Sequence, residues 1–318
     1  MAKIAAVVVT YNRKELLLEN INSLLNQTYN DGLDIVIIDN ASSDGTAEAV
    51  LPFVNDKKII YINTGSNLGG AGGFQYGVKY AALKKYDFVW LMDDDCIPKA
   101  NALEEFMKFD NDNEGTYGFL SSKVLWKDGN ICTMNIQRRK LTKTIKFKQV
   151  KDKPVNIVMA SFVSLFIPMN IVYELGLPIK EFFIWTDDFE YTRRISRKYK
   201  CYLIPKSVVI HKSKNNVGAN IATDDYERID RYLYLYRNDV YLYRREGLRG
   251  FNYEIIRLTD HIIRCLFKAK NHRFKRISKI IKGTKNGFKF KPKIEYVNID
   301  KTDRISWFYQ FLFYAIII

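Results

Sequence analysis

Four continuous apolar segments, spaced regularly over the first part of the chain, most constrain the fold of this 318-residue sequence. Runs of this kind are typical of parallel strands covered on both faces. The stretches between them have helical periodicity, and strand–helix–strand units build parallel sheets through right-handed connections. The predicted strands are residues 3–9, 35–38, 59–62 and 88–92. The sequence therefore predicts an α/β fold with a mainly parallel sheet and helices on both faces.

The predicted helices have recognisable start signals. Asn12 is expected to cap the first helix, with Glu15 three residues later as in a capping box. Later helices are expected to begin near Ser43–Asp44, which are good capping residues, and near Gly72–Gly73.

Polar residues follow each predicted strand, at the edge where parallel α/β sheets bind ligands. Arg13 follows the first strand and offers a cation for phosphate, and Asp39 follows the second and offers an acceptor for a base or ribose. The glycine-rich segment 69–73 lets backbone amides approach a ligand ahead of a helix. A surface cation, a turn or a flexible loop would explain each feature alone. Their combination predicts a nucleotide diphosphate site.

Three adjacent carboxylates, Asp93, Asp94 and Asp95, close the fourth apolar segment. Like charges repel more strongly where water is excluded, so a buried cluster of this kind needs a cation. Carboxylate oxygens are ligands for Mg²⁺ or Mn²⁺, which can also hold phosphate oxygens. A solvated acidic turn is the simpler alternative, but the neighbouring loops favour a metal site.

The loops at these strand ends resemble those of family-2 glycosyltransferases, which are inverting, nucleotide-sugar-dependent enzymes of the GT-A (Rossmann-like) fold. The matching segments are residues 7–13, 37–46, 67–74 and 90–95. Segment 67–74 is the most specific, because it is similar to the bacterial galactofuranosyltransferase branch and to some rhamnosyltransferases. We expect the nucleotide-sugar-binding and catalytic domain to span residues 1–225.

The resemblance implies roles for individual residues. Asp95 would bind the metal, Mn²⁺ or Mg²⁺, and Asp94 the ribose or donor sugar. A lone histidine at a strand end is usually structural, but the galactofuranosyl branch implies that His211 completes the metal shell. The residues expected to bind the nucleotide sugar are Thr10, Tyr11, Arg13, Asp39, Asn67, Gly69, Gly70, Asp93 and Asp94.

A second acidic pair, Asp187 and Asp188, follows an aromatic segment. A neighbouring carboxylate in a partly apolar pocket raises the pKa of a carboxyl group, as a general base requires. The resemblance implies that Asp188 is this base, and Asp187 its partner. Trp185 and Glu190 are expected to bind the acceptor, because rings stack on sugars and carboxylates bond to hydroxyls. The acidic first turn of an ordinary helix is the structural alternative.

At Thr186 the chain departs from the galactofuranosyl pattern, in which a tryptophan directly precedes the acid pair. Trp185 lies one residue earlier. The details of acceptor stacking are therefore open.

The positive charge of the chain is concentrated towards its C-terminal end. The formal net charge is +15, and residues 244–293 contain 16 Lys and Arg against three Asp and Glu. Apolar residues alternate with these charges, as in a helix that lies in an anionic membrane interface. Nucleic acid attracts the same charge, but it would not need the apolar run 307–318, which is too short to span a bilayer. We expect residues 226–318 to form a helical, basic, membrane-proximal extension that binds no nucleic acid.

The N-terminal sequence and the spacing of the cysteines indicate the cellular compartment. No signal peptide is visible at the N-terminus, and the four cysteines have no paired spacing, which is typical of cytosolic thiols. We expect a cytoplasmic protein, peripheral at the inner face of the cell membrane. The basic stretch 138–148 is expected to form a hairpin or mobile loop near the acceptor.

Taken with the resemblance, the sequence predicts a metal-dependent inverting transferase that moves galactofuranose from UDP-galactofuranose to a lipid-linked or polysaccharide acceptor. A dTDP-rhamnose rhamnosyltransferase is the alternative of the same class. A glycoside hydrolase would need two carboxylates but no nucleotide site. A non-catalytic protein that binds an anionic membrane or nucleic acid would need only the basic extension. The oligomeric state is open, with a homo-oligomer among the alternatives.

Overall fold

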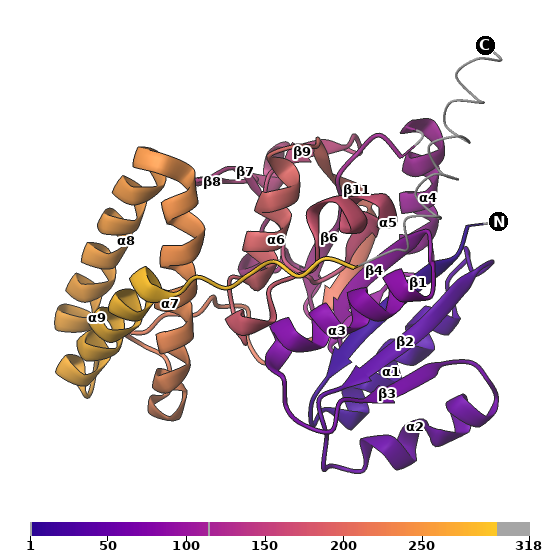
Figure 1. The fold of residues 1–318 in the computed structure, drawn as a ribbon, viewed down its shortest axis with the longest axis horizontal. Coiled ribbons are helices and arrows are strands. Elements are labelled where there is room, and N and C mark those ends of the chain that lie inside the picture. Colours follow the sequence, from indigo (N-terminus) through magenta and orange to yellow (C-terminus); the bar gives the residue numbers. More distant parts are fainter. Residues whose placement is uncertain (1, 114, 298–318) are drawn as a thin grey trace.

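The computed structural model describes residues 2–113 and 115–297 (Figure 1). A large sheet with helices on both faces forms one side of the molecule, and a separate helical unit forms the other. The apolar run 307–318, which the sequence analysis assigned to the membrane-proximal extension, lies outside the described residues.

The first half of the sheet is parallel, as predicted. Strands β3, β2, β1 and β4 lie side by side in that order, and all three pairings are parallel. Their bounds are Ile60–Asn63, Leu33–Asp39, Ile4–Thr10 and Phe88–Asp93. The carboxyl ends of these strands therefore meet at one edge, where the polar loops follow them.

Two apolar layers lie on the two faces of this sheet. Successive residues of β1 alternate between them, with Val7 in one layer and Val8 in the other. Helix α3 (Gly69–Leu83) covers the first face, and α1, α2 and α4 cover the second. The bounds of these three helices are Lys14–Leu25, Thr46–Asn55 and Ala102–Asn113.

The predicted cap of α1 is wrong. Asn12 has a left-handed backbone (φ 52°), and its side-chain oxygen accepts the Ser43 amide at 2.7 Å. The amide of Lys14, at the start of α1, instead donates to the Asp44 carboxylate at 3.0 Å. Because the loops after β1 and β2 lie side by side, Asp44 serves both helices: it accepts the Lys14 amide of α1 and the Thr46 hydroxyl at the start of α2.

The second half of the sheet is mixed. Strand β10 is antiparallel to both β4 and β6, β11 is parallel to β6, and β5 and β9 pair antiparallel with β11. In the β5–β11 pairing, His211 lies opposite Cys96, and Cys96 directly follows the three aspartates. The bounds are Cys96–Pro98 for β5, Leu120–Trp126 for β6, Val155–Ile157 for β9, Leu165–Pro168 for β10 and Cys201–His211 for β11.

The basic stretch 138–148 contains the predicted hairpin, formed by β7 (Arg138–Lys140) and β8 (Lys143–Thr144). Two short helices complete the sheet-containing half of the molecule: α5 (Met169–Leu175) and α6 (Asp187–Ser196). Single 3₁₀ turns at residues 133–135, 147–149 and 180–182 connect these elements.

The described part of the extension, residues 226–297, is mainly helical. After a 3₁₀ turn at Tyr226–Arg231, it consists of α7 (Tyr232–Tyr243), α8 (Gly247–Lys268) and α9 (Arg273–Lys289). Helices α7 and α9 pack closely, because a Cβ at Gly287 of α9 would lie 2.5 Å from Val240 Cβ. Within the part of the chain that the structure describes, no helix combines the length and apolarity needed to cross a bilayer.

After α9 the chain returns to the sheet-containing half of the molecule. Residues 290–297 run as an extended segment towards α3 and α5 (Figure 1). There Leu177 N–H donates to the Glu295 carbonyl at 2.8 Å, and the Glu295 carboxylate contacts Gln75 Nε2 at 2.6 Å and Lys79 Nζ at 2.5 Å. The helical unit is therefore attached to the sheet-containing half through both of its ends.

Candidate active site

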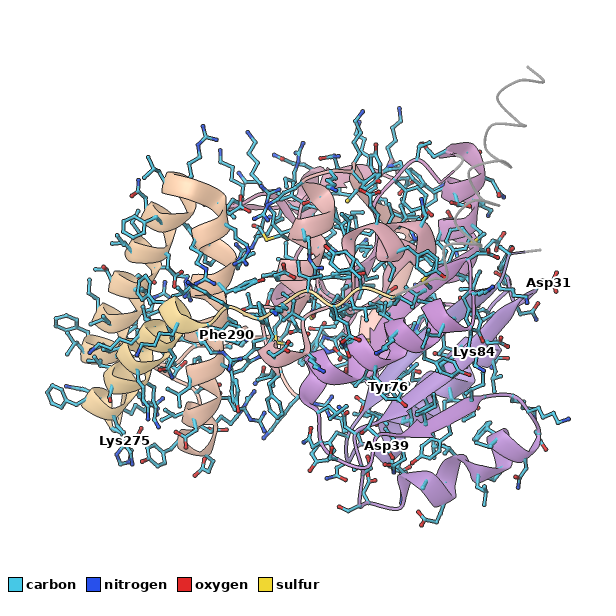
Figure 2. All side chains as sticks on the ribbon, in the orientation of Figure 1. Asp31, Asp39, Tyr76, Lys84, Lys275 and Phe290 are labelled. Atoms are coloured by element: carbon cyan, nitrogen blue, oxygen red, sulfur yellow. The ribbon has the colours of Figure 1, made fainter. Side chains whose placement is uncertain are left out.

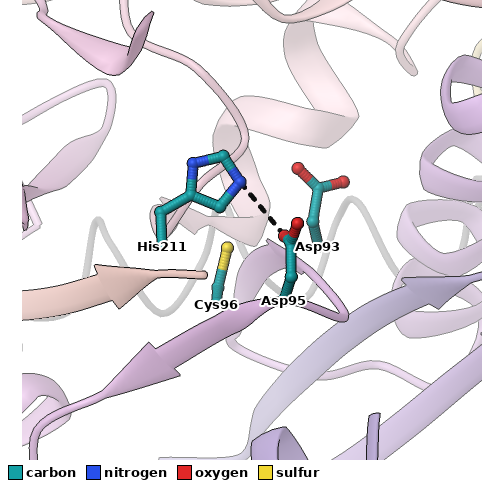
Figure 3. Close-up of side chains that lie close together, drawn as sticks. All are labelled: Asp93, Asp95, Cys96 and His211. Carbon is teal, nitrogen blue, oxygen red and sulfur yellow. Dashed lines mark ion pairs between the residues drawn. The ribbon is translucent and has the colours of Figure 1, made fainter. Parts of the chain in front are cut away.

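The β4–β5 turn and the end of β11 bring four metal-ligating side chains together. Potential ligand atoms of Asp93, Asp95, Cys96 and His211 all lie within 4.8 Å of one another (Figure 3). Burial and the charge of Asp95 raise the pKa of Asp93 to about 7. This cluster joins two residues that the sequence analysis assigned to the metal, Asp95 and His211.

His211 lies between two acceptors. Its Nε2 is 3.1 Å from Asp95 Oδ1, and its Nδ1 is 2.8 Å from Asn135 Oδ1. An amide oxygen only accepts, so Nδ1 carries the hydrogen and Nε2 faces the carboxylate. Burial lowers the His211 pKa, but the contact with Asp95 outweighs it and raises the pKa to about 10. A positive charge is therefore favoured where Nε2 meets the carboxylates.

The donor set fits a divalent metal ion. Two carboxylates and an imidazole are ligands for a first-row transition ion such as Mn²⁺, whereas Mg²⁺ rarely takes nitrogen. The Cys96 thiol is less suited to a hard ion, because burial and the charge of Asp95 raise its pKa well above the usual value. The cluster can thus hold a metal through oxygen and imidazole nitrogen.

Arg13 and Thr10 hold the middle aspartate. The Thr10 hydroxyl donates to Asp94 at 2.8 Å, and Arg13 Nη1 contacts Asp94 at 3.1 Å and Asp95 at 2.9 Å. Burial raises the Asp94 pKa to about 6, although the charge of Arg13 opposes this rise. The Arg13 side chain is 50% exposed, so part of its guanidinium group remains open to a ligand.

The other predicted nucleotide residues line the same edge. Asp39 is buried and accepts from the Ser42 amide at 2.9 Å and from the Tyr61 hydroxyl at 2.5 Å. Tyr11 is exposed. No described atom lies within 4 Å of a Cβ built at Gly70, so this backbone is open to an incoming group.

Gly69 has a packing role that the sequence did not indicate. Its φ is +72°, and a Cβ there would lie 2.2 Å from the Phe183 carbonyl oxygen. The side chain of exposed Asn67 accepts the Gly69 amide at 2.9 Å. The glycine-rich loop therefore packs against the segment that precedes the second acidic pair.

The pair Asp187–Asp188 begins helix α6. Burial raises the Asp187 pKa to about 6, and burial together with the Asp187 charge raises the Asp188 pKa well above its usual value. The charge of Asp93 also raises the Asp188 pKa, whereas that of Arg138 lowers it. The two acidic clusters are therefore within electrostatic reach of each other.

Helix α7 holds the loop before this acid pair. The buried Asn238 amide donates to the carbonyl groups of Phe182, Ile184 and Trp185 at 2.9 to 3.1 Å. The Thr186 hydroxyl donates to Asp239 at 2.7 Å. These bonds support a loop in which three residues without glycine's freedom have positive φ: Phe183, Trp185 and Thr186.

The two predicted acceptor residues already have protein partners. Trp185 is half-buried, with its ring 5.1 Å from that of Tyr232 in the helical extension. Glu190 is buried and pairs with Arg194 at 2.9 Å. Their binding of an acceptor stays a prediction.

The sequence analysis missed Asn135, Asn238 and Asp239. Nothing in the sequence marks Asn135, which ends the 3₁₀ turn 133–135 and contacts His211 only through the fold. The pair Asn238–Asp239 does carry a signal, because these short polar residues, with Arg237 before them, interrupt the aromatic and aliphatic sequence of helix α7.

The comparison with protein families decides the identity. Residues 5–164, half of the chain, match the family model described as glycosyl transferase family 2. The chain belongs to glycosyltransferase family 2. As a member, it is an enzyme that transfers sugar from a nucleotide-sugar donor.

Relatives of this family-2 glycosyltransferase differ in what they transfer. An uncharacterized glycosyltransferase of Methanocaldococcus jannaschii is 27% identical over 67% of this chain and 71% of the relative. A galactofuranosyltransferase of Mycolicibacterium smegmatis is 34% identical over 30% of each chain. A GalNAc(5)-diNAcBac-PP-undecaprenol β-1,3-glucosyltransferase of Campylobacter jejuni is 32% identical over 41% of each. The chain thus spans less than half of the two relatives whose sugar is named.

A solved structure confirms the GT-A fold. GalNAc-T7 with UDP, GalNAc and Mn²⁺ matches with a TM-score of 0.57 at 15% identity, over 81% of this chain and 55% of that one. The mixed sheet and its surrounding helices thus belong to the GT-A glycosyltransferases, as the resemblance implied.

Proposed function

We propose that this family-2 glycosyltransferase is metal-dependent and inverting, and that it transfers galactofuranose from UDP-galactofuranose to a lipid-linked or polysaccharide acceptor. The observation that carries the proposal is the cluster of potential metal ligands formed by Asp93, Asp95 and His211, with the buried acid pair Asp187–Asp188 within electrostatic reach of Asp93. Segment 67–74 and the mycolicibacterial relative support the donor sugar.

The strand-end loops would bind the donor. The half-exposed side chain of Arg13 suits phosphate, and carboxylate oxygens of Asp39 and Asp94 suit N–H or hydroxyl groups. The backbone at Gly70 leaves room for a diphosphate ahead of α3. The full donor set remains Thr10, Tyr11, Arg13, Asp39, Asn67, Gly69, Gly70, Asp93 and Asp94.

Asp95 and His211, with Asp93 beside them, would hold the metal ion. Bound there, Mn²⁺ would supply Lewis-acid charge to stabilise the departing diphosphate. Asn135 keeps the hydrogen of His211 on Nδ1, so that Nε2 faces the cluster.

Asp188 would act as the general base. An acceptor hydroxyl gives its proton to the Asp188 carboxylate while its oxygen attacks the anomeric carbon from the face opposite UDP. The bond from the anomeric carbon to the diphosphate oxygen breaks, its electrons leave with UDP, and the configuration inverts. The raised pKa of Asp188 suits this role, because a more basic carboxylate accepts the proton more readily.

The acceptor would bind beside this base. Trp185 offers a ring face next to the acid pair, and Glu190 a carboxylate on the same helix turn as Asp187. The undecaprenol-linked substrate named for the Campylobacter relative supports a lipid-linked acceptor.

Rhamnose transfer from dTDP-rhamnose is the second candidate, because segment 67–74 is similar in both branches. Family membership disfavours the non-catalytic alternative. A homo-oligomer stays among the alternatives.

Donor hydrolysis by the purified chain tests the proposal. UDP-galactofuranose, UDP-glucose, UDP-N-acetylglucosamine and dTDP-rhamnose would each be incubated with Mn²⁺, and the released nucleotide measured. We expect fastest release from UDP-galactofuranose, and none from an Asp95→Asn variant. Faster release from dTDP-rhamnose would move the donor to rhamnose, and release unaffected by Asp95→Asn would contradict the assigned metal site.

A further inference from the structure

The protein-facing side of helix α8 carries both apolar and polar residues. Leu258, Ile262 and Cys265 pack in the apolar cluster of the helical unit. Glu254, Arg257 and His261 lie on the same side. Arg257 pairs with Glu254 at 2.8 Å and with Asp239 of α7 at 2.9 Å, and His261 Nδ1 lies 2.8 Å from the Tyr236 hydroxyl. Charged and apolar contacts thus together attach α8 to the rest of the protein.

A second set of apolar residues of α8 faces away from the protein. Leu248 is 82% exposed, Ile256 68% and Phe267 79%. At 3.6 residues per turn they share one broad arc of the helix with other exposed apolar side chains. These are Phe251, Ile255, Ile263 and Leu266. An exposed apolar arc of this size marks an interaction surface.

Exposed cations accompany this arc on α8 and α9. Arg249 and Arg264 are exposed on α8, and Arg264 pairs with Asp260 at 2.8 Å. Helix α9 adds Phe274, which is 82% exposed, and a row of exposed lysines: Lys275, Lys282, Lys285 and Lys289. Figure 2 shows Lys275 at the outer end of the helical unit, away from Asp39 at the nucleotide edge of the sheet.

We propose that the exposed apolar face of α8, with the basic side of α9, docks on an anionic membrane surface. In this arrangement the apolar arc enters the boundary between headgroups and acyl chains, and the flanking cations contact anionic headgroups. Docking would bring the enzyme to lipid-linked acceptors, and in that respect it extends the proposed function. It uses no residue of the donor or base sites.

Charge distinguishes the membrane from other occupants. A second copy on a twofold axis would bring the same basic rim against itself, and residues 244–293 hold 16 Lys and Arg against three Asp and Glu. Nucleic acid would satisfy the cations but leave the apolar arc of α8 in water. An anionic lipid surface satisfies both.

Cosedimentation of the full chain with vesicles tests the docking face. Vesicles of phosphatidylcholine would be compared with vesicles that also contain phosphatidylglycerol. The test variant combines Ile256→Ser and Phe267→Ser, and the control combines Leu51→Ser and Leu83→Ser, which are exposed on α2 and α3. We expect the test variant to bind anionic vesicles at least about tenfold more weakly than the wild type, since it loses apolar burial. We expect the control to bind like the wild type.

The remaining outcomes separate the alternatives. Equal vesicle binding by the test variant and the wild type would overturn the proposal, as would no binding of the wild type to anionic vesicles. A wild-type dimer in light scattering that the test variant converts to a monomer would assign the face to a second copy. Thermal unfolding and UDP binding of each variant show whether the fold and donor site are unchanged, so failure here is distinguishable from failure of the proposed transfer.

Discussion

The hydroxyl of Thr186 donates a 2.7 Å hydrogen bond to the carboxylate of Asp239. This bond joins the residue directly before the acid pair to helix α7 of the extension. Asp239 also pairs with Arg257 at 2.9 Å, so α8 supports the same carboxylate. The geometry of the proposed base therefore depends on helices that follow the family-matched segment in the sequence.

Thr186→Val should lower kcat by about tenfold while the Kd for UDP stays unchanged, because misplacing the base loop impairs only the reacting geometry. Valine keeps the shape, and Asp239 retains Arg257. The control is Thr284→Val, which removes a hydroxyl bonded within α9. Steady-state kinetics and calorimetric UDP titration measure both effects. Equal kcat in Thr186→Val and wild type would exclude the positioning role.

Asp188→Asn should reduce transfer by about 10²–10⁴-fold with little change in UDP binding, as expected for loss of a general base. Asp187→Asn should retain more activity, because it removes only the neighbouring charge that raises the Asp188 pKa. Initial rates with a saturating acceptor distinguish them. A dead Asp187→Asn beside an active Asp188→Asn would assign the base to the other carboxylate.

On the acid side of the pH profile, kcat should begin to fall at a pH above the usual pKa of a carboxylate. The folded-state pKa of Asp188 is raised by burial and by Asp187, and the base must be ionised. Activity is therefore lost as the pH falls through that raised value. In Asp187→Asn this fall should move to lower pH, because a neighbouring negative charge is gone. A fall that stays in place in this variant would argue against the coupling.

Mn²⁺ and UDP together should raise the melting temperature more than UDP with a chelator, because binding to the native state stabilises it. Mn²⁺ affinity should weaken as the pH falls, since His211, with a pKa raised to about 10, must give up its Nε2 proton to bind. In Asp95→Asn the Mn²⁺-dependent part of the shift should disappear. Shifts that are identical with and without metal would contradict the site.

The free energy of unfolding should fall in acid, because the folded protein holds His261 in its neutral form. Burial and the charge of Arg257 lower its pKa to about 4 in the folded protein, below the usual value of about 6.5. The folded state thus favours the neutral ring, and its contribution is present above about pH 6.5 and is lost as the pH falls towards 4. Urea unfolding at neutral and acid pH should show a smaller loss for His261→Gln than for the wild type.

The parallel half of the fold was readable because each strand is a continuous apolar run and each ends in polar residues. The mixed half was not, because β5, β9 and β10 are short and find their partners only in three dimensions. The same limit applies to the site. Asp95 and Asp188 stand in recognisable acidic runs, whereas Asn135 and Asn238 act through contacts with residues far away in sequence.

Because residues 290–297 return to α3, a protein shortened after α9 would lose contacts outside the helical unit as well. Ending the chain after α9 would remove the Glu295 carboxylate from Gln75 and Lys79 and the Glu295 carbonyl from Leu177. The helices would then keep the chain connection before α7 but lose this second attachment, and only packing and side-chain bonds would hold Asn238 against the base loop. Catalysis would become sensitive to a cut made far from any reacting atom.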